Sequence, residues 1–311
     1  QYFYLIKSKH SDTKYRMWMR NFLQAVSKTP IVIYTDVKSS ENVLELIKRT
    51  PNPKTVLIFD DIWRVVDLFE LESDRTIRLR DIYEREQHSI DPEHQLHSSE
   101  LYAVWNLKSY MVYRSAQENE YKSSYFVYND IGSFRHASFK DSWPNEQFTV
   151  RTLAKLNDRI LFSQIAQKPP QNPYSSLGDY IQGGFFAGSA RAIQFMYEHF
   201  YAIHDQLVSH GRFVGKDQKI MNIISHRLAD RVCQLSMFSL GECLVDPNVW
   251  FVYKNYFSSC FAVSAYSQLF DSESECYLEA NKLIRLNASS IRCDSDREHV
   301  GLSNWLLCNK N

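Results

Sequence analysis

Asp130 directly follows a short run of apolar and aromatic residues at 125–128 and comes two positions before Gly132. Tyr, Phe and Val in that run are typical of a buried strand, and a glycine after an acid predicts an abrupt turn. In open α/β sheets, ligands bind outside the carboxyl ends of the strands. Mn²⁺ and Mg²⁺ prefer oxygen ligands and usually take one or two carboxylates together with substrate phosphates. The pattern therefore predicts that Asp130 binds Mn²⁺ or Mg²⁺ in a diphosphate site, although a lone aspartate can also simply cap a turn.

A second polar segment contains adjacent glycines, Gly183 and Gly184, between a strand-like run and a helix-like run. Adjacent glycines let a ligand approach the backbone closely, and the start of the following helix favours anions. The spacing matches neither the dinucleotide-binding fingerprint nor the P-loop. A bulged strand packed on a helix would explain the glycines, but it would not explain the polar Gln182 among apolar neighbours.

A third segment, 215–218, predicts the start of another helix. Within it Lys216 adjoins Asp217, and Gln218 lies four residues before Asn222, so Gln218 and Asn222 share one helix face. As a single residue, Asp217 is interpreted equally well as a helix cap. A carboxylate beside a lysine suits catalysis or acceptor positioning better than it suits simple helix capping.

Lys108 lies on a predicted helix, from 100 to 112, that precedes the Asp130 strand. A lysine at this place can reach a phosphate as a point charge, although most helical lysines are simply solvated.

Alternating strand-like and helix-like patterns are expected to position these residues. Strand patterns at 2–6, 31–34 and 56–59 are separated by helical periodicity at 15–26 and 43–47. This order predicts a parallel sheet covered by helices, and hence an α/β fold.

Two further segments are predicted to lie outside the core. The charged stretch 71–98 is predicted to be an insertion or lid-like connection, with His88, His94 and His97 at the surface. The stretch 167–176, which is rich in Pro and Gln, predicts a loop or hinge.

The composition excludes several classes of protein. The 311 residues include 36 Lys plus Arg and 36 Asp plus Glu, with 44% hydrophobic residues. A large core is therefore expected, and a neutral chain without a basic block argues against nucleic-acid binding through net charge. No apolar run is long enough for a membrane span. The chain starts without Met and without a signal peptide, so we expect a trimmed or processed product.

All six cysteines lie in the last third of the chain, near a glycosylation sequon at Asn287. An even count in one region favours disulfide bonds and a secretory setting, namely the lumen of the Golgi or endoplasmic reticulum, or secretion. Six buried thiols and a chance sequon are the alternative interpretation. No C-x-x-C spacing occurs, so a zinc site is not expected.

Several collinear blocks resemble the HtrL/YibB-type family, the WlaTC-like proteins, which are classed as glycosyltransferases. The resemblance spans about residues 1–255 and rests on these blocks: 7–11, Tyr15, 18–19, 21–23, 35–36, 101–108, 129–135, 182–188 and 215–218 with Asn222. It implies a GT-A-like (Rossmann-type) fold with a mostly parallel sheet flanked by helices. Residues 1–255 would form the nucleotide-sugar-binding and catalytic domain, and the Cys-bearing extension 256–311 would pack on it. The extension departs from bacterial members and indicates a eukaryotic, secretory-pathway relative.

The resemblance also implies roles for individual residues. Asp130 stands where other sugar transferases end their Asp-x-Asp metal motif, with Tyr128 in place of the first acid. A looser similarity to glycogenin-like retaining transferases assigns Lys108 to the diphosphate, and Gln182 and Asp217 to the reaction site. The residues expected at the donor are Lys7, Ser8, Thr35, Asp36, Lys108, Asn129, Gly183 and Gly184, and those expected at the acceptor are Lys216 and Gln218.

The expected function is transfer of a hexose from a nucleotide-diphosphate sugar, such as a UDP-sugar, to a glycan or glycoprotein, assisted by a metal. Donor sugar, acceptor, stereochemical outcome and oligomeric state are left open. The alternative is an inactive glycan- or nucleotide-sugar-binding protein on the same scaffold, which the loss of an acid at Tyr128 favours. A glycoside hydrolase using Asp60 or Asp61 with Asp130 ranks last, because no aromatic sugar platform accompanies a pair of acids.

Overall fold

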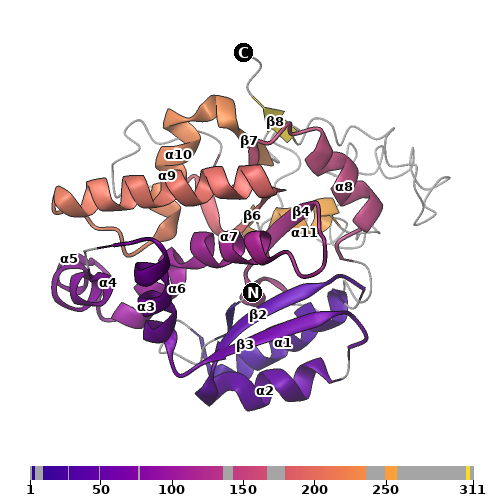
Figure 1. The fold of residues 1–311 in the computed structure, drawn as a ribbon, viewed down its shortest axis with the longest axis horizontal. Coiled ribbons are helices and arrows are strands. Elements are labelled where there is room, and N and C mark those ends of the chain that lie inside the picture. The colour runs from indigo at the N-terminus through magenta and orange to yellow at the C-terminus, as the bar shows by residue number, and fades with distance from the viewer. Residues whose placement is uncertain are drawn as a thin grey trace, which may run out of the picture.

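The first sheet is parallel and is formed by the N-terminal part of the chain. The computed structural model describes residues 2–3, 10–26, 28–48, 50–75, 78–135, 143–166, 179–235, 249–257 and 306–308. The strands are β1 (Tyr2–Phe3), β2 (Ile31–Asp36) and β3 (Lys54–Phe59), in the order β1-β2-β3. Helices α1 (Asp12–Ala25) and α2 (Val37–Ile47) connect them, and α3 (Ile62–Glu72) follows β3. The predicted alternation of strands and helices is confirmed (Figure 1).

The segment predicted to be a surface insertion is helical and packs into the core. It contains α4 (Leu79–Asp81), a π-helical stretch (Ile82–Gln87) and α5 (His88–Ile90), followed by α6 (Ser99–Asn106). Leu79 and Tyr83 are fully buried because their side chains join the main hydrophobic cluster. The prediction of a lid-like connection outside the core is therefore wrong for these residues.

His97 corrects a second prediction about this segment. His88 is half-buried and His94 is exposed, but His97 is only 3% exposed. Its Nδ1 atom lies 2.8 Å from Oδ2 of Asp91, and the Tyr102 hydroxyl donates to the same oxygen at 2.6 Å. These hydrogen bonds satisfy the buried Asp91 carboxylate and hold His97 away from the surface.

The second sheet is mixed, with the strand order β4-β6-β5-β7-β8. Its strands are β4 (Tyr125–Asn129), β5 (Ile160–Gln164), β6 (Ile181–Ser189), β7 (Val232–Leu235) and β8 (Leu306–Cys308). β4, β5 and β7 run in one direction, while β6 and β8 run in the other. The α/β fold class is confirmed, but the expectation of a mostly parallel sheet is wrong for this second sheet, because β5 with β7 is the single parallel pair among its described strands.

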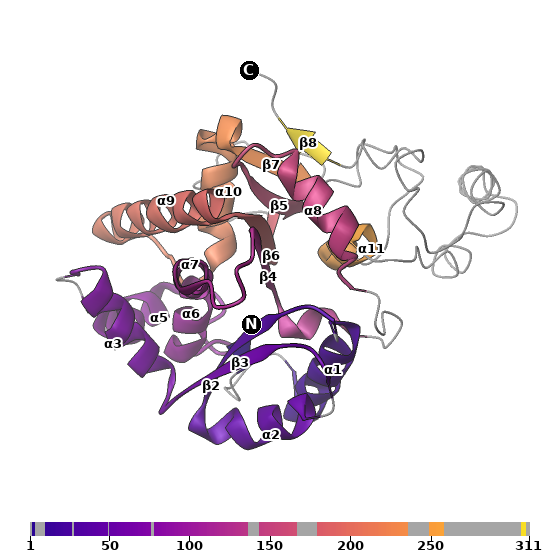
Figure 2. The ribbon, with the colours of Figure 1, turned by 45° about the vertical axis from the view of Figure 1, so that its right-hand side comes forward.

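Both faces of the second sheet are buried. Adjacent residues of β6, Phe185 and Phe186, belong to two different hydrophobic clusters, as do Leu161 and Phe162 of β5. This separation follows from the alternation of side chains across a strand. Helices α7 (Lys108–Glu118), α9 (Ala190–Ser209) and α10 (Asp217–Arg227) cover one face, and α8 (Glu146–Ala154) and α11 (Val252–Phe257) cover the other, as Figure 2 shows.

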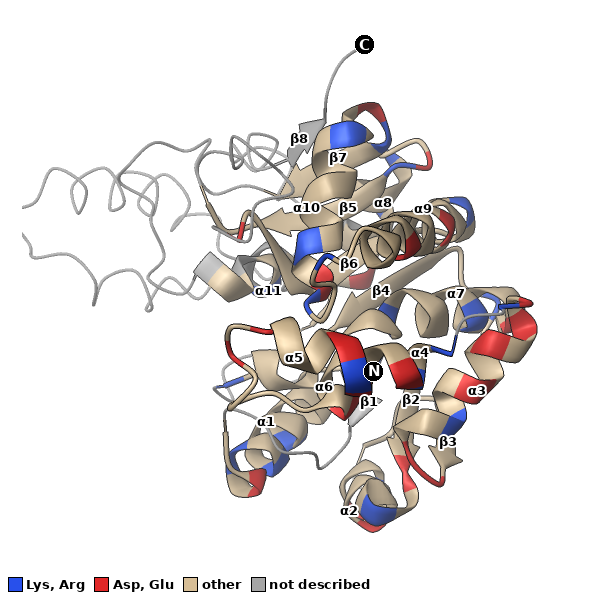
Figure 3. Ribbon diagram, turned by 90° about the vertical axis from the view of Figure 1, so that its left-hand side faces the viewer, with Lys and Arg blue, Asp and Glu red and all other residues tan. Residues whose placement is uncertain are grey.

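The C-terminal strand β8 extends this same sheet by pairing with β7. The division at residues 255 and 256 stays a prediction, since most of the extension lies outside the described residues. Basic and acidic residues are interspersed on the side of the molecule that Figure 3 shows. Among the described residues, no helix is both long enough and apolar enough to cross a membrane.

Candidate active site

The three polar segments predicted from the sequence meet at one edge of the second sheet. β4, β5 and β7 end at this edge and β6 begins there, because β6 runs antiparallel to β4 and β5. The backbone N–H of Asp130, just after β4, donates to the carbonyl oxygen of Gly184 at 2.7 Å. Asp217 reaches the same strand from the first residue of α10. The edge is therefore the carboxyl end of three strands, where α/β proteins bind ligands.

Lys108 and Asp217 form a buried ion pair. Nζ of Lys108 donates to Oδ2 of Asp217 at 2.7 Å and to the carbonyl oxygen of Gly183 at 2.9 Å. Both side chains are 6% exposed. Burial raises the pKa of Asp217, and the neighbouring ammonium of Lys108 opposes that increase. Lys108 therefore positions Asp217, and its contacts leave less of the ammonium for the diphosphate contact expected from the sequence.

Asp217 does not have the capping geometry of the alternative interpretation. Lys216 occupies the N-cap position of α10, and no side-chain hydrogen bond caps the helix. Asp217 is the first helical residue instead.

Gly183 and Gly184 separate two carboxylates. A Cβ atom on Gly183 would lie 2.7 and 2.8 Å from the carboxylate oxygens of Asp217. A Cβ atom on Gly184 would lie 2.8 Å from Oε1 of Gln182 and 3.1 Å from Cβ of Asp130. Each glycine thus makes room for a different acid, and the Gly183–Gly184 step packs against Asp217 on one side and Asp130 on the other.

Asp130 keeps one carboxylate oxygen without a hydrogen bond. Its Oδ1 accepts from the N–H of Gly132 at 2.7 Å, while its Oδ2 has no hydrogen-bond partner among the described residues. The side chain of Asn129 holds this turn, because its Nδ2 donates to the carbonyl oxygen of Asp130 at 2.9 Å. Asp130 is half-buried, so the free oxygen is compatible with a ligand from outside the protein.

Tyr128 cannot replace the missing acid of the metal motif. Its ring stacks on Phe186 with 5.2 Å between the centroids, and only 3% of the residue is exposed. Burial raises its pKa well above the ordinary value of 10.0, so the phenol stays neutral. No cluster of three or more His, Cys, Asp or Glu side chains suited to a metal occurs in the described part of the chain. The residues therefore fit a cation held by Asp130 and completed by substrate phosphates, as Mg²⁺ often is.

Gln182 carries an unsatisfied donor at this edge. Its Oε1 accepts from the N–H of Gly184 at 3.0 Å, but its Nε2 is buried and has no hydrogen-bond partner within the described part of the chain. A buried amide left unpaired costs about 1–3 kcal/mol. The orphaned group is therefore suited to a ligand oxygen or a water molecule.

Two residues predicted to bind the acceptor take part in contacts around α10. Lys216 forms an ion pair with Glu93, a residue of the segment that also contains His97. Nε2 of Gln218 lies 3.5 Å from the carbonyl oxygen of Ile181, and Oδ1 of Asn222 accepts from the Ile181 N–H at 2.8 Å. These contacts fix the start of α10 against the start of β6.

The remaining predicted residues either belong to the first sheet or lie outside the described residues. Thr35 and Asp36 are at the end of β2, in the first sheet, and Oδ1 of Asp36 accepts from the Ser39 N–H at 2.7 Å, which caps α2. Lys7, Ser8 and Asn287 lie outside the described residues. The structure brings together Lys108, Asn129, Asp130, Gln182, Gly183, Gly184, Asp217 and Gln218.

Two basic residues near the Asp130 turn were not predicted as site residues from the sequence. Lys254 of α11 is buried and donates to the carbonyl oxygen of Ser133. The guanidinium carbon of Arg135 lies over the ring of Trp18. Arg135 belongs to the block 129–135, but neither its aromatic neighbours nor the approach of α11 could be inferred from local spacing.

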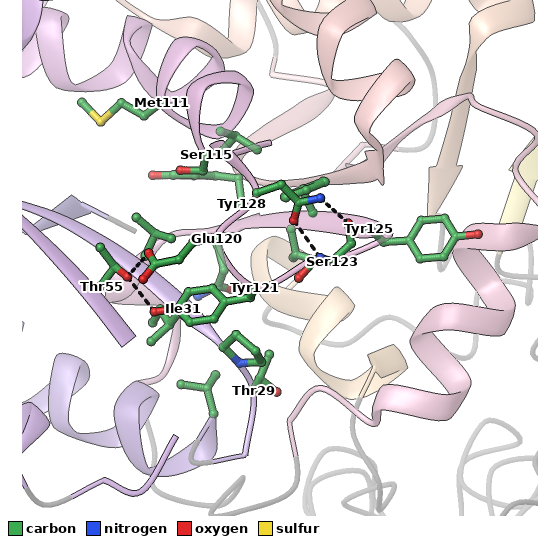
Figure 4. Close-up of a pocket in the computed structure, with 18 of the residues that line it drawn as sticks. Thr29, Ile31, Thr55, Met111, Ser115, Glu120, Tyr121, Ser123, Tyr125 and Tyr128 are labelled. Atoms are coloured by element: carbon green, nitrogen blue, oxygen red, sulfur yellow. Dashed lines mark hydrogen bonds between the residues drawn. The ribbon is translucent and has the colours of Figure 1, made fainter. Parts of the chain in front are cut away.

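A pocket between the two sheets is separate from this acidic site. It is lined by residues of β2, β4 and α7. The side chain of Thr55 forms hydrogen bonds there with the side chains of Glu120 and Tyr121 (Figure 4). Tyr128 and Asn129 line it, but Asp130 and Asp217 do not.

Comparison with known proteins finds a similarity in the fold but none in the sequence. No protein-family model matches the chain, and no curated protein matches it. The fold is similar to the crystal structure of mouse xyloside xylosyltransferase 1 in its apo form. The similarity covers 76% of this chain and 83% of that chain, with 11% sequence identity and a TM-score of 0.47.

Proposed function

We propose that this protein is a glycosyltransferase that moves a hexose from a nucleotide-diphosphate sugar of the UDP type to a glycan or glycoprotein. One observation carries the proposal. Asp130 and the buried Lys108–Asp217 pair lie on opposite sides of the Gly183–Gly184 step, at the carboxyl edge of the sheet. One acid has an oxygen available to a cation, and the other is held against the backbone of β6 by Lys108.

A role for each residue of the site follows from these contacts. Asp130 would hold Mn²⁺ or Mg²⁺, which as a Lewis acid stabilises the charge on a departing diphosphate. Gly183 and Gly184 let the two carboxylates lie close against the backbone of β6. The unpaired Nε2 of Gln182 is suited to a sugar hydroxyl, and the Asp217 carboxylate supplies negative charge near the developing positive sugar centre. Lys108 keeps that carboxylate in place.

The second candidate is an inactive protein that binds glycans or nucleotide sugars, and the buried, neutral Tyr128 favours it. Calorimetry with UDP and GDP, with and without Mn²⁺, tests the proposal against this candidate. The transferase should bind at least one nucleotide more tightly when Mn²⁺ is present. Absence of metal-linked nucleotide binding would count against the transferase.

The kinship with HtrL/YibB-type proteins and the secretory location are parts of the same proposal. They rest on the collinear blocks, on the clustered cysteines and on the sequon at Asn287. Expression through a secretory route, followed by analysis of the attached glycans, tests the location.

Asp130→Asn is expected to fold normally and to abolish metal-assisted transfer. The substitution keeps the size of the side chain and an oxygen that can accept from the Gly132 N–H, but it removes the charge that attracts a cation. The measurement is transfer rate against Mn²⁺ concentration, with the melting temperature as the control for folding. Wild-type activity of this variant at limiting Mn²⁺ would remove Asp130 from the metal site.

Cys233 and Cys308 are expected to form a disulfide bond. Cys233 is fully buried, and the antiparallel register of β7 and β8 places it opposite Cys308. Opposed residues in such a pair have Cα atoms about 4.5–5.5 Å apart, within the range of disulfides. Cys233 is disulfide-bonded and therefore not a free thiol.

Peptide mapping without reduction should therefore recover the two peptides as one linked species. Reduction should lower stability by about 2–4 kcal/mol. Recovery of both residues as alkylated free thiols, in protein made through a secretory route, would contradict this pairing.

A further inference from the structure

Arg135 presents a fixed cation beside the Asp130 turn. It is exposed, and its guanidinium carbon lies 4.9 Å from the ring centroid of Trp18 and 5.1 Å from that of Phe251. Two aromatic rings from distant parts of the chain thus hold one side chain. Such contacts restrict the orientation of a guanidinium and leave its N–H groups available at the edge.

The same indole supports the turn that carries Asp130. A Cβ atom on Gly132 would lie 3.4 Å from Cε3 of Trp18. The N–H of Arg135 donates to the carbonyl oxygen of Ser133 at 3.0 Å, which keeps the chain close to the turn. The Asp130 carboxylate and the Arg135 guanidinium therefore belong to one small structural unit built on Trp18.

These two opposite charges do not pair with each other. No ion pair joins Arg135 to any carboxylate among the described residues, and Oδ2 of Asp130 has no described hydrogen-bond partner. An acid and a base left unpaired on one turn are both available to a third group. A diphosphate with its cation satisfies both, because the cation binds the carboxylate and a phosphate oxygen binds the guanidinium.

We propose that Arg135 binds a phosphate of the nucleotide-diphosphate donor and thereby contributes to the specificity for a diphosphate. The inference rests on the proposed function. It assigns to Arg135 the cationic role that was predicted for Lys108, whose ammonium donates to Asp217 and to the carbonyl oxygen of Gly183. Loss of a charge-assisted hydrogen bond typically costs about 1.5–3 kcal/mol, which corresponds to about 10- to 150-fold in Kd.

Arg231 provides a matched control. It is also exposed, and its guanidinium carbon lies 4.7 Å from the ring centroid of Phe195. It has no ion pair with a described carboxylate either. Arg231 directly precedes β7, whereas Asp130 follows β4, and these strands run in the same direction. The two arginines therefore lie at opposite edges of the second sheet.

The test is calorimetric titration of wild type, Arg135→Gln, Arg135→Lys and Arg231→Gln with UDP, GDP and uridine in the presence of Mn²⁺. We expect Arg135→Gln to weaken diphosphate binding by about tenfold or more, Arg135→Lys to weaken it less, and Arg231→Gln to match wild type. Uridine should bind wild type and Arg135→Gln equally.

Wild-type affinity for UDP and GDP in a folded Arg135→Gln variant would overturn the role of Arg135 and leave the proposed function intact. Failure of the wild-type protein to bind either nucleotide would instead overturn the proposed function itself, and the inference with it.

Discussion

Asp217→Asn should lower the kcat of sugar transfer by about 100-fold or more while leaving the affinity for UDP nearly unchanged. The carboxylate lies against Gly183 and is held by Lys108, on the other side of the glycine step from Asp130. A group that stabilises charge developing at the sugar acts mainly in the transition state, so its loss appears in kcat. Steady-state kinetics of a purified variant, combined with UDP titration, measures both quantities.

The partner lysine supplies the control for this experiment. Removing one member of a buried ion pair leaves the other charge uncompensated, which typically costs about 3–5 kcal/mol. If Lys108 acts only through Asp217, the double variant Lys108→Met with Asp217→Asn should be no slower than Asp217→Asn alone. It should also be more stable than either single variant. Near-normal kcat in Asp217→Asn would show that Asp217 is structural.

Alanine at the two adjacent glycines should produce two different kinetic defects. Alanine at position 183 would place Cβ 2.7 Å from the Asp217 carboxylate, so Gly183→Ala should lower kcat by displacing that acid. Alanine at position 184 would place Cβ 2.8 Å from Oε1 of Gln182 and 3.1 Å from Cβ of Asp130, so Gly184→Ala should mainly weaken binding of Mn²⁺ and the donor by displacing both side chains. The measurements are kcat, KM for the donor and the Mn²⁺ concentration for half-maximal rate.

Gly211→Ala serves as the control for these variants. A Cβ atom there would meet nothing within 4 Å, but the backbone φ of +62° disfavours alanine. The change should cost about 1 kcal/mol of stability without altering kcat or KM. The same kinetic defect in Gly183→Ala and Gly184→Ala would contradict the separation of the two acids.

Local sequence patterns were sufficient for much of the fold and for the location of the site. The alternation of strands and amphipathic helices was enough to predict the first sheet, because the periodicity of apolar side chains indicates which positions are buried. Asp130 could be selected because it follows an apolar run, Gln182 because it is polar among apolar neighbours, and Asp217 because it adjoins a lysine at a predicted helix start. The fold then brought these residues to one edge, where the carboxyl ends of parallel strands meet.

Local sequence patterns could not predict contacts between distant parts of the chain. The buried pair of Lys108 and Asp217 joins residues 109 positions apart, so no spacing rule could find it. The direction of β6 could not be predicted either, because an apolar run has the same pattern in a parallel and in an antiparallel strand. His97 was placed at the surface because its hydrogen bond to Asp91 has no sequence signal.

The most direct test of the central claim is a donor-hydrolysis screen with Mn²⁺, using UDP-, GDP- and CMP-sugars and detecting the released nucleotide. Water takes the place of the acceptor in this screen, so acceptor identity is not needed. We predict release of UDP from at least one UDP-sugar by the wild-type protein, and strongly reduced release by Asp130→Asn and Asp217→Asn. Release of no nucleotide from any donor by folded wild-type protein, or equal release by all three proteins, would contradict a transferase site at this edge of the sheet.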